Sequence, residues 1–267
     1  MEQRTFERFR QIVYENSGIA LGPNKQALVA ARIGKRMRQL GIAAHKDYLN
    51  FLTQGEQHDE LIYLVDVIST NVTSFYREPE HFGFIREVVS RWLAAGQRRF
   101  RFWSAACSTG EEPYSLAMAL ADVMESYDCD CKILASDIST AALRRCHAGT
   151  YAVHKLKGLP RSEQDRWFER SHDGEQDAIT IKPAIRKMVV FTRLNLSQPP
   201  FPMAGPFDMV LCRNVMIYFD NLVRKRLLDE VFRLVRPDGY LLVGHAESLT
   251  GMMSSFKSLR PSIYVKR

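Results

Sequence analysis

Two adjacent glutamates follow a loop of small residues in the middle of the chain. Residues 102–113 read FWSAACSTGEEP, which predicts a buried strand, a loop, and a helix that begins at Glu111 and Glu112. The small side chains would let backbone N–H groups approach a ligand closely. Carboxylates at a helix start would repel a phosphate, and they would suit a ligand with a positive end. In the alternative interpretation, both glutamates simply favour the helix N-terminus.

An acidic residue follows the next predicted strand. Residues 132–135 form this strand, and Asp137 comes where the strand meets its loop. At the tip of the second strand of an open α/β sheet, a carboxylate can accept hydrogen bonds from both hydroxyls of a ribose. The GxGxxG pattern of a dinucleotide site and the lysine of a P-loop are both absent, which argues against a nicotinamide dehydrogenase. S-adenosylmethionine joins a nucleoside to a sulfonium and an amino group, so it fits both observations.

Two further polar segments carry hydrogen-bonding groups. Residues 208–220 (DMVLCRNVMIYFD) place Asn214 and Tyr218 after a buried strand, and residues 71–77 (NVTSFYR) precede the sheet. Asn214 and Tyr218 resemble the Asn-Pro-Pro-Tyr loop of amine-modifying methyltransferases, but both prolines are missing. This difference counts against an exocyclic amine as the substrate. A helix-capping linker, with Arg77 paired at the surface, is the alternative interpretation of residues 71–77.

The elements that must position these residues fall into two parts. Up to about residue 70 the pattern is helical, and the predicted helices cover residues 6–13, 25–40, 48–52 and 61–68. After residue 100, short strands alternate with helices. The predicted strands are 100–105, 132–135, 188–192, 207–212, 240–243 and 263–265. The predicted helices are 111–125, 139–146, which Ser139 would cap, and 222–235. This alternation predicts an α/β fold with a mostly parallel sheet and helices on both faces.

One stretch interrupts the alternation. Residues 150–187 are polar and irregular, and residues 178–181 could pair with 188–192 as a hairpin. The pattern is compatible with a small insertion on the sheet, and the residues alone favour the alternative of a plain surface excursion.

The composition is that of an ordinary globular protein. Of the 267 residues, 46% are hydrophobic and 25% are charged. The net charge of +7 favours an acidic partner such as nucleic acid, an anionic membrane or an acidic protein, and a basic surface without such a partner is the alternative. The five cysteines show no CxxC or Cys/His ligand spacing, so neither a metal site nor a disulfide framework is predicted. We expect free thiols in a reducing cytoplasm. No apolar run is long enough to span a membrane, and the N-terminal segment lacks the apolar core of a secretory signal.

These blocks resemble the CheR family of chemoreceptor glutamate methyltransferases, and the resemblance runs nearly end to end. The segments that carry it are 71–77 (NVTSFYR), 103–115 (WSAACSTGEEPYS), 135–138 (ASDI), 195–196 (NL), 212–220 (CRNVMIYFD) and 244–248 (GHAES). It implies a Rossmann-like methyltransferase fold with a small all-α N-terminal domain and a small β insertion. The corresponding domains would be residues 1–75, which dock the receptor, and residues 76–267, with a β subdomain within 150–193.

The resemblance also implies roles for individual residues. Contacts to S-adenosylmethionine, or to its product S-adenosylhomocysteine, are expected from Asn71, Thr73, Arg77, Glu111, Asp137, Asn195, Leu196, Cys212 and Arg213. Tyr218 would face the transferred methyl group, and Tyr218 and Arg77 are the candidate catalytic residues. Cys107 stands where the family often has alanine, a change between small residues that we expect to be harmless.

The implied reaction is esterification of glutamate side chains on the cytoplasmic domain of chemotaxis receptors. A carboxylate is itself the nucleophile at neutral pH, so no general base is required. Two other functions stay open, a nucleic-acid methyltransferase and a module that binds the cofactor without turnover. The first is disfavoured because the sequence has no basic stretch with interleaved aromatic residues. We expect a cytoplasmic monomer that neither binds nucleic acid nor inserts into a membrane.

The basic helix at residues 25–40 is a candidate docking surface for acidic receptor helices. Its cations are Lys25, Arg32, Lys35, Arg36 and Arg38. Lys25, Arg32 and Arg36 are spaced by seven and four residues, which predicts that they share one face of the helix. A solvated basic helix without a partner is the alternative.

Overall fold

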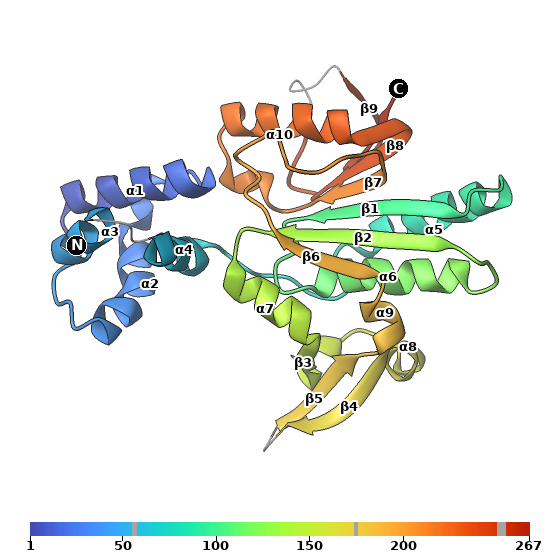
Figure 1. Ribbon diagram of the computed structural model, residues 1–267, viewed down its shortest axis with the longest axis horizontal. Coiled ribbons are helices and arrows are strands. Elements are labelled where there is room, and N and C mark those ends of the chain that lie inside the picture. The colour runs from blue at the N-terminus through green and yellow to red at the C-terminus, as the bar shows by residue number, and fades with distance from the viewer. Residues whose placement is uncertain (55–57, 174–175, 250–254) are drawn as a thin grey trace.

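Helices gather at one end of the molecule, and a large twisted sheet occupies most of the rest (Figure 1). The computed structural model describes residues 1–54, 58–173, 176–249 and 255–267. From β1 onward, strands alternate with helices, which confirms the predicted α/β class. No helix in the described ranges is both long and apolar enough to cross a membrane.

The N-terminal helices form a unit with its own core. They are α1 (Gln3–Ser17), α2 (Gln26–Gln39), α3 (His45–Thr53) and α4 (His58–Ile68). Apolar residues at helical spacing meet in a cluster that includes the buried side chains Phe6, Phe9, Ile33, Tyr48 and Leu64. Because this cluster is separate from those on the sheet, the unit buries its apolar residues by itself.

The large sheet is parallel over most of its width. Its strands, in spatial order, are β6 (Val189–Arg193), β2 (Asp130–Asp137), β1 (Arg99–Ala105), β7 (Phe207–Cys212), β8 (Val235–Val243), β10 (Ile263–Lys266) and β9 (Phe256–Arg260). Only the pairings of β10, with β8 and with β9, are antiparallel among those described for this sheet. Every residue of β7 is buried, as expected for a strand that is covered on both faces.

Helices cover both faces of this sheet (Figure 1). On one face lie α5 (Pro79–Ala94), α6 (Glu111–Met124) and α7 (Thr140–Ala148), and on the other lies α10 (Asn221–Leu234). The side chain of Ser139 accepts a hydrogen bond from the Ala142 N–H at 3.1 Å and so caps α7, as predicted. Helix α5 was not predicted, although Phe82, Ile85 and Val89 recur at helical spacing and are buried against the sheet.

A second, antiparallel sheet projects from the large one. It has the order β3 (Thr150–Ala152), β5 (Gln176–Ile181) and β4 (Phe168–Asp173), and the intervening chain includes a short 3-10 helix at Val153–Leu156 and α8 (Arg161–Trp167). The insertion is therefore confirmed, but the predicted hairpin between residues 178–181 and 188–192 is wrong. The short helix α9 (Pro183–Arg186) turns the chain away, so that β6 pairs in parallel with β2 instead.

Two of the basic residues on α2 are engaged inside the helical unit. The Arg36 guanidinium donates to both carboxylate oxygens of Glu60, with its shortest bond at 2.6 Å, and the Tyr48 hydroxyl donates to the same carboxylate at 2.7 Å. Arg32 donates to carbonyls at the end of α4, where a cation is favoured by the helix dipole. Arg32 and Arg36 are therefore structural residues, and the exposed cations of this region are Lys25, Lys35 and Arg38.

Replacing Arg36 with alanine should lower the free energy of unfolding by about 1–3 kcal/mol, because the buried Glu60 carboxylate would lose its charged hydrogen bonds. Urea unfolding followed by circular dichroism measures this change. The matched control is Lys35→Ala, an exposed neighbour whose loss should change stability by less than about 0.5 kcal/mol. Equal stability of the two variants would show that the Arg36–Glu60 pair contributes nothing.

Candidate functional site

The order of the strands creates a crevice at one edge of the large sheet. From β1 the chain moves outward to β2 and β6, and then returns to the other side of β1 with β7 and β8. The loops after β1 and β7 therefore diverge at the carboxyl ends of these strands, which is where open α/β sheets bind ligands. A cavity of about 220 Å³ lies there, bounded by both loops, by residues 68–74 and by the N-terminal helices.

The loop after β1 has an unusual backbone. Ala106 and Ser108 adopt φ values of 64° and 51°, which non-glycine residues rarely do, and both line the cavity. Gly110 follows with φ 99°, and a Cβ there would lie 2.7 Å from the Tyr151 hydroxyl oxygen. Strained residues of this kind cluster at binding sites, because the surrounding structure must hold them in place.

Asp137 ends β2 with each of its carboxylate oxygens bonded to the backbone. One oxygen accepts the Ser108 N–H at 2.7 Å, and the other accepts the Ser139 N–H at 2.9 Å. Burial raises the pKa of this carboxyl to about 6, although the backbone N–H donors act in the opposite direction. Since each carboxylate oxygen has two lone pairs, Asp137 can still accept two more hydrogen bonds from a ligand.

A buried guanidinium joins the loop after β7 to two other segments. The Arg213 side chain is 1% exposed and donates to the carboxylate of Glu112 at 2.9 Å and to that of Glu78 at 3.0 Å. It also donates to the backbone carbonyl of Arg77. Burial raises the pKa of Glu112, whereas in Glu78 the opposing effects of Arg213 and further donors outweigh burial and lower the pKa.

Most of the residues predicted for the site come together around the cavity. Those that line it are Asn71, Thr73, Arg77, Asp137, Asn195, Leu196, Arg213 and Tyr218. Glu111 is fully buried elsewhere, where its carboxylate accepts from the Thr109 hydroxyl at 2.6 Å and from Lys155 at 2.9 Å. Cys212 is buried within β7, and neither residue lines the cavity. Of the two adjacent glutamates, Glu112 and not Glu111 lines the cavity, together with Asp137.

The choice between the two glutamates follows from helix geometry. Consecutive residues of a helix point about 100° apart, so only one of Glu111 and Glu112 can face the sheet edge. Glu112 turns toward β1, where the Ser104 hydroxyl donates to it at 2.7 Å, and Glu111 turns toward the small sheet. The sequence spacing could not show which of the two glutamates faces the cavity, because both lie in the first turn of the same helix.

The helical unit forms the remaining side of the cavity. Near the end of α1, the Tyr14 hydroxyl donates to the Asp220 carboxylate at 2.6 Å, and the Ala20 N–H donates to the Tyr218 carbonyl at 2.8 Å. Gly18 is required between these contacts, because a Cβ there would lie 2.4 Å from the Cβ of Ser197. Asn195 extends the attachment by donating to the Asn16 carbonyl at 2.9 Å.

Comparisons with known proteins identify this arrangement. The model of the all-alpha domain of CheR methyltransferases matches residues 4–69, and the model of their SAM binding domain matches residues 71–265. The chain belongs to the CheR methyltransferase family. It is therefore an S-adenosylmethionine-dependent methyltransferase, as the resemblance of its motifs predicted.

Full-length relatives agree with the family models. A chemotaxis protein methyltransferase of Escherichia coli K12 is 35% identical over 259 residues, which cover 97% of this chain and 89% of the relative. One of Borreliella burgdorferi is 36% identical over 266 residues, covering 97% of this chain and 93% of the relative. Chemotaxis protein methyltransferase 1 of Pseudomonas aeruginosa is 36% identical over 265 residues, covering 96% and 94%.

The cavity of this CheR methyltransferase fits S-adenosylmethionine in chemical terms. Asp137 retains two acceptor positions that would suit the ribose hydroxyls, and the strained loop at Ala106 and Ser108 forms part of the cavity wall. The Glu112 carboxylate and the Arg213 guanidinium also line the cavity, where they would suit the charged amino-acid end of S-adenosylmethionine.

Cofactor affinity should depend on pH through Asp137. The ionised carboxylate is the better acceptor for two hydroxyls, and its pKa in the free protein is raised to about 6. Affinity for S-adenosylhomocysteine should therefore be about tenfold lower at pH 5 than at its plateau above pH 7. Calorimetric titration between these pH values measures the effect.

The Asp137→Asn variant should bind more weakly and lose most of this pH dependence. Asp229→Asn, an exposed carboxyl on α10 that pairs with Lys225, is the control and should retain it. A wild-type profile in the folded Asp137→Asn variant would remove Asp137 from the ribose site.

Proposed function

We propose that this enzyme esterifies glutamate side chains on the cytoplasmic domain of chemotaxis receptors and releases S-adenosylhomocysteine. The proposal is supported by two cations at the cavity wall, Lys25 and Arg77, which form no ion pair with a carboxylate in the described part of the chain. They leave net positive charge where a substrate would enter, and a glutamate carboxylate is complementary to it. The names of the relatives, chemotaxis protein methyltransferases, point to the same class of substrate.

The residues around the cavity would act mainly by positioning. Bound S-adenosylmethionine supplies a methyl group on a sulfonium leaving group, and the substrate carboxylate attacks without a general base. In the proposed arrangement, Arg77 attracts and holds this carboxylate. Tyr218, on the short 3-10 helix Met216–Tyr218 after β7, orients the carboxylate toward the methyl group. Closure around both ligands would exclude water and strengthen these electrostatic contacts.

The product should be an alkali-labile methyl ester. With radiolabelled S-adenosylmethionine and receptor-containing membranes, label should appear on a receptor-sized band and leave it in mild alkali. Tyr218→Phe should lower the initial rate by about tenfold while the affinity for S-adenosylhomocysteine stays unchanged, because only the positioning of the substrate is lost.

An alkali-stable adduct would instead indicate N-methylation and contradict the proposed reaction. Label on added nucleic acid would support the competing class of methyltransferase that the basic charge left open. Tyr240→Phe, whose ring packs against Phe84 and Trp92 far from the cavity, is the matched control for loss of a tyrosine hydroxyl.

We further propose that residues 1–75 dock the receptor while residues 76–267 carry the reaction, in a cytoplasmic monomer. The exposed cations Lys25, Lys35 and Arg38 lie on or just before α2, and Lys25 reaches the cavity wall. Receptor helices that carry several glutamates are anionic, so this surface would steer them toward the cavity. Single exposed ion pairs contribute about 0.2–1 kcal/mol, and the effect must therefore come from the group.

Reversing the charge of Lys35 and Arg38 to Glu together should slow receptor methylation strongly at low salt and less at high salt, because salt screens exposed charges. Affinity for S-adenosylhomocysteine should not change. Reversing Arg99 and Lys257, which are exposed on β1 and β9 of the large sheet, is the control with the same change in net charge. If both double variants methylate receptors equally fast at low salt, α2 is not the docking surface.

A further inference from the structure

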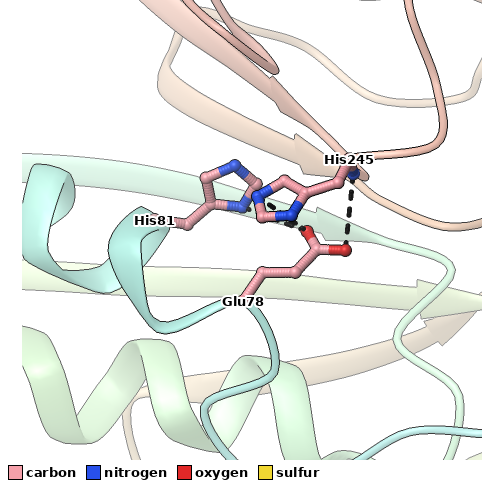
Figure 2. A group of neighbouring side chains, drawn as sticks. All are labelled: Glu78, His81 and His245. Carbon is pink, nitrogen blue, oxygen red and sulfur yellow. Dashed lines mark hydrogen bonds and ion pairs between the residues drawn. The ribbon is translucent and has the colours of Figure 1, made fainter.

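Two histidines and a glutamate converge beside the cofactor cavity without lining it. Glu78 immediately precedes α5, His81 lies in the first turn of that helix, and His245 follows β8 (Figure 2). The Glu78 carboxylate oxygen Oε2 is 3.5 Å from Nδ1 of His81 and 4.0 Å from Nε2 of His245. One ligand atom from each residue lies within 4.8 Å of the others. None of the three is placed in contact with the cofactor or the substrate, and Glu78 acts in the cofactor site only through its pairing with Arg213.

The orientation of His81 leaves a lone pair directed at this carboxylate. The ring is 0% exposed, and its Nε2 lies 2.7 Å from the Ser262 hydroxyl, which itself donates to the Pro261 carbonyl at 2.6 Å. When the Ser262 proton lies on the Pro261 carbonyl, Nε2 of His81 donates to Ser262, and in this tautomer of the neutral ring Nδ1 carries the lone pair. Nδ1 has no hydrogen-bond partner among the described residues. A nitrogen lone pair and a carboxylate oxygen thus face each other in a buried place, and they repel unless a cation lies between them.

We propose that Glu78, His81 and His245 bind a divalent transition-metal ion of the zinc type. Two imidazoles and a carboxylate are a common donor set for Zn²⁺. With bonds of about 2.0–2.1 Å to a tetrahedral ion, ligand atoms lie roughly 3.4 Å apart. The two separations from Glu78, 3.5 Å and 4.0 Å, are close to this value, and the three ligand atoms, which lie within 4.8 Å of one another, would have to close to roughly 3.4 Å to enclose an ion.

The surroundings of the three residues are suited to such an ion. Glu80 is 2.5 Å from Nε2 of His245 and can supply a carboxylate oxygen as the fourth ligand. Both of these side chains are about half exposed, which gives the ion a path from solvent. Ser262 contacts Nε2 of His81, the ring nitrogen opposite Nδ1, and Arg213 donates to Oε2 of Glu78, so both side chains are held in place, as outer groups commonly orient metal ligands. The positive charge of Arg213 is also matched by Glu112, so the carboxylates of Glu78 and Glu80 together can balance a divalent ion.

A bound ion would connect the start of α5 to the end of β8. Glu78 also accepts from the Asn214 side chain at 3.3 Å and from Arg213, both in the loop after β7. The ion would thereby hold one wall of the cofactor cavity in place without contacting the cofactor or the substrate. The proposed metal site is therefore independent of which group accepts the methyl.

The test measures Zn²⁺ binding by the full chain after treatment with a chelator. Competition against a chromophoric chelator should show one tight site, and Zn²⁺ should raise the Tm. Because thiolates also bind zinc, the titration is done in a Cys129→Ser, Cys131→Ser background, which removes the two partly exposed thiols. His245→Ala should weaken binding by at least about 100-fold and abolish the Tm shift. Glu80→Gln should weaken binding less.

His147→Ala is the matched control, since it removes another exposed histidine that lies on α7. It should bind Zn²⁺ as tightly as the parent protein. His245 is replaced in preference to the buried His81, and an unchanged affinity for S-adenosylhomocysteine verifies that the variant is folded. Failure of the parent protein to bind Zn²⁺, or equal binding by the His245→Ala variant, would overturn the proposed site.

Discussion

A single buried cation holds the cofactor site together. The Arg213 guanidinium is 1% exposed, and a charge buried this deeply requires opposite charge and hydrogen bonds from its surroundings. Glu112 on α6, Glu78 before α5 and the Arg77 carbonyl provide them at the two terminal nitrogens, whereas Nε has no hydrogen-bond partner among the described residues. These partners come from two segments far apart in the sequence, residues 77–78 and the first turn of α6, so satisfying one side chain fixes the relative positions of the loop after β7, the start of α6 and the linker into the sheet.

The need of buried charges for partners also fixes the path of the linker at residues 71–77. Lys155, from the chain that leads into the small sheet, donates both to Glu111 and to the Thr73 carbonyl at 3.4 Å. Glu111 therefore supports the linker from one side and Arg213 supports it from the other. The two adjacent glutamates serve the same cavity in different ways, Glu112 at its wall and Glu111 through the backbone that forms its rim.

The sequence predicted those helices and strands that depend on interactions between residues close together in the chain. The strands around the cavity and the cap at Ser139 follow from apolar patterning and from hydrogen-bonding side chains, and the family was recognisable from its motifs. The missed features depend on contacts between distant segments. The side of α6 that faces the cavity, the partner of Arg36 and the pairing of β5 are decided by tertiary packing. The proximity of His81 to His245 depends on where β8 lies in the sheet, so no short-range ligand spacing could reveal it.

The attachment of α1 to the sheet has a thermodynamic consequence for the whole chain. Separate family models describe the helical part and the sheet part, yet the cavity has walls from both, joined where Gly18 packs against Ser197. A ligand that touches both walls must favour their association, and by reciprocity their association must favour the ligand. Ligand binding and the association of the two parts are therefore thermodynamically linked. A substitution in the α1 contact, distant from any reacting atom, would change the fraction of molecules competent to bind and so act on affinity without altering a ligand contact.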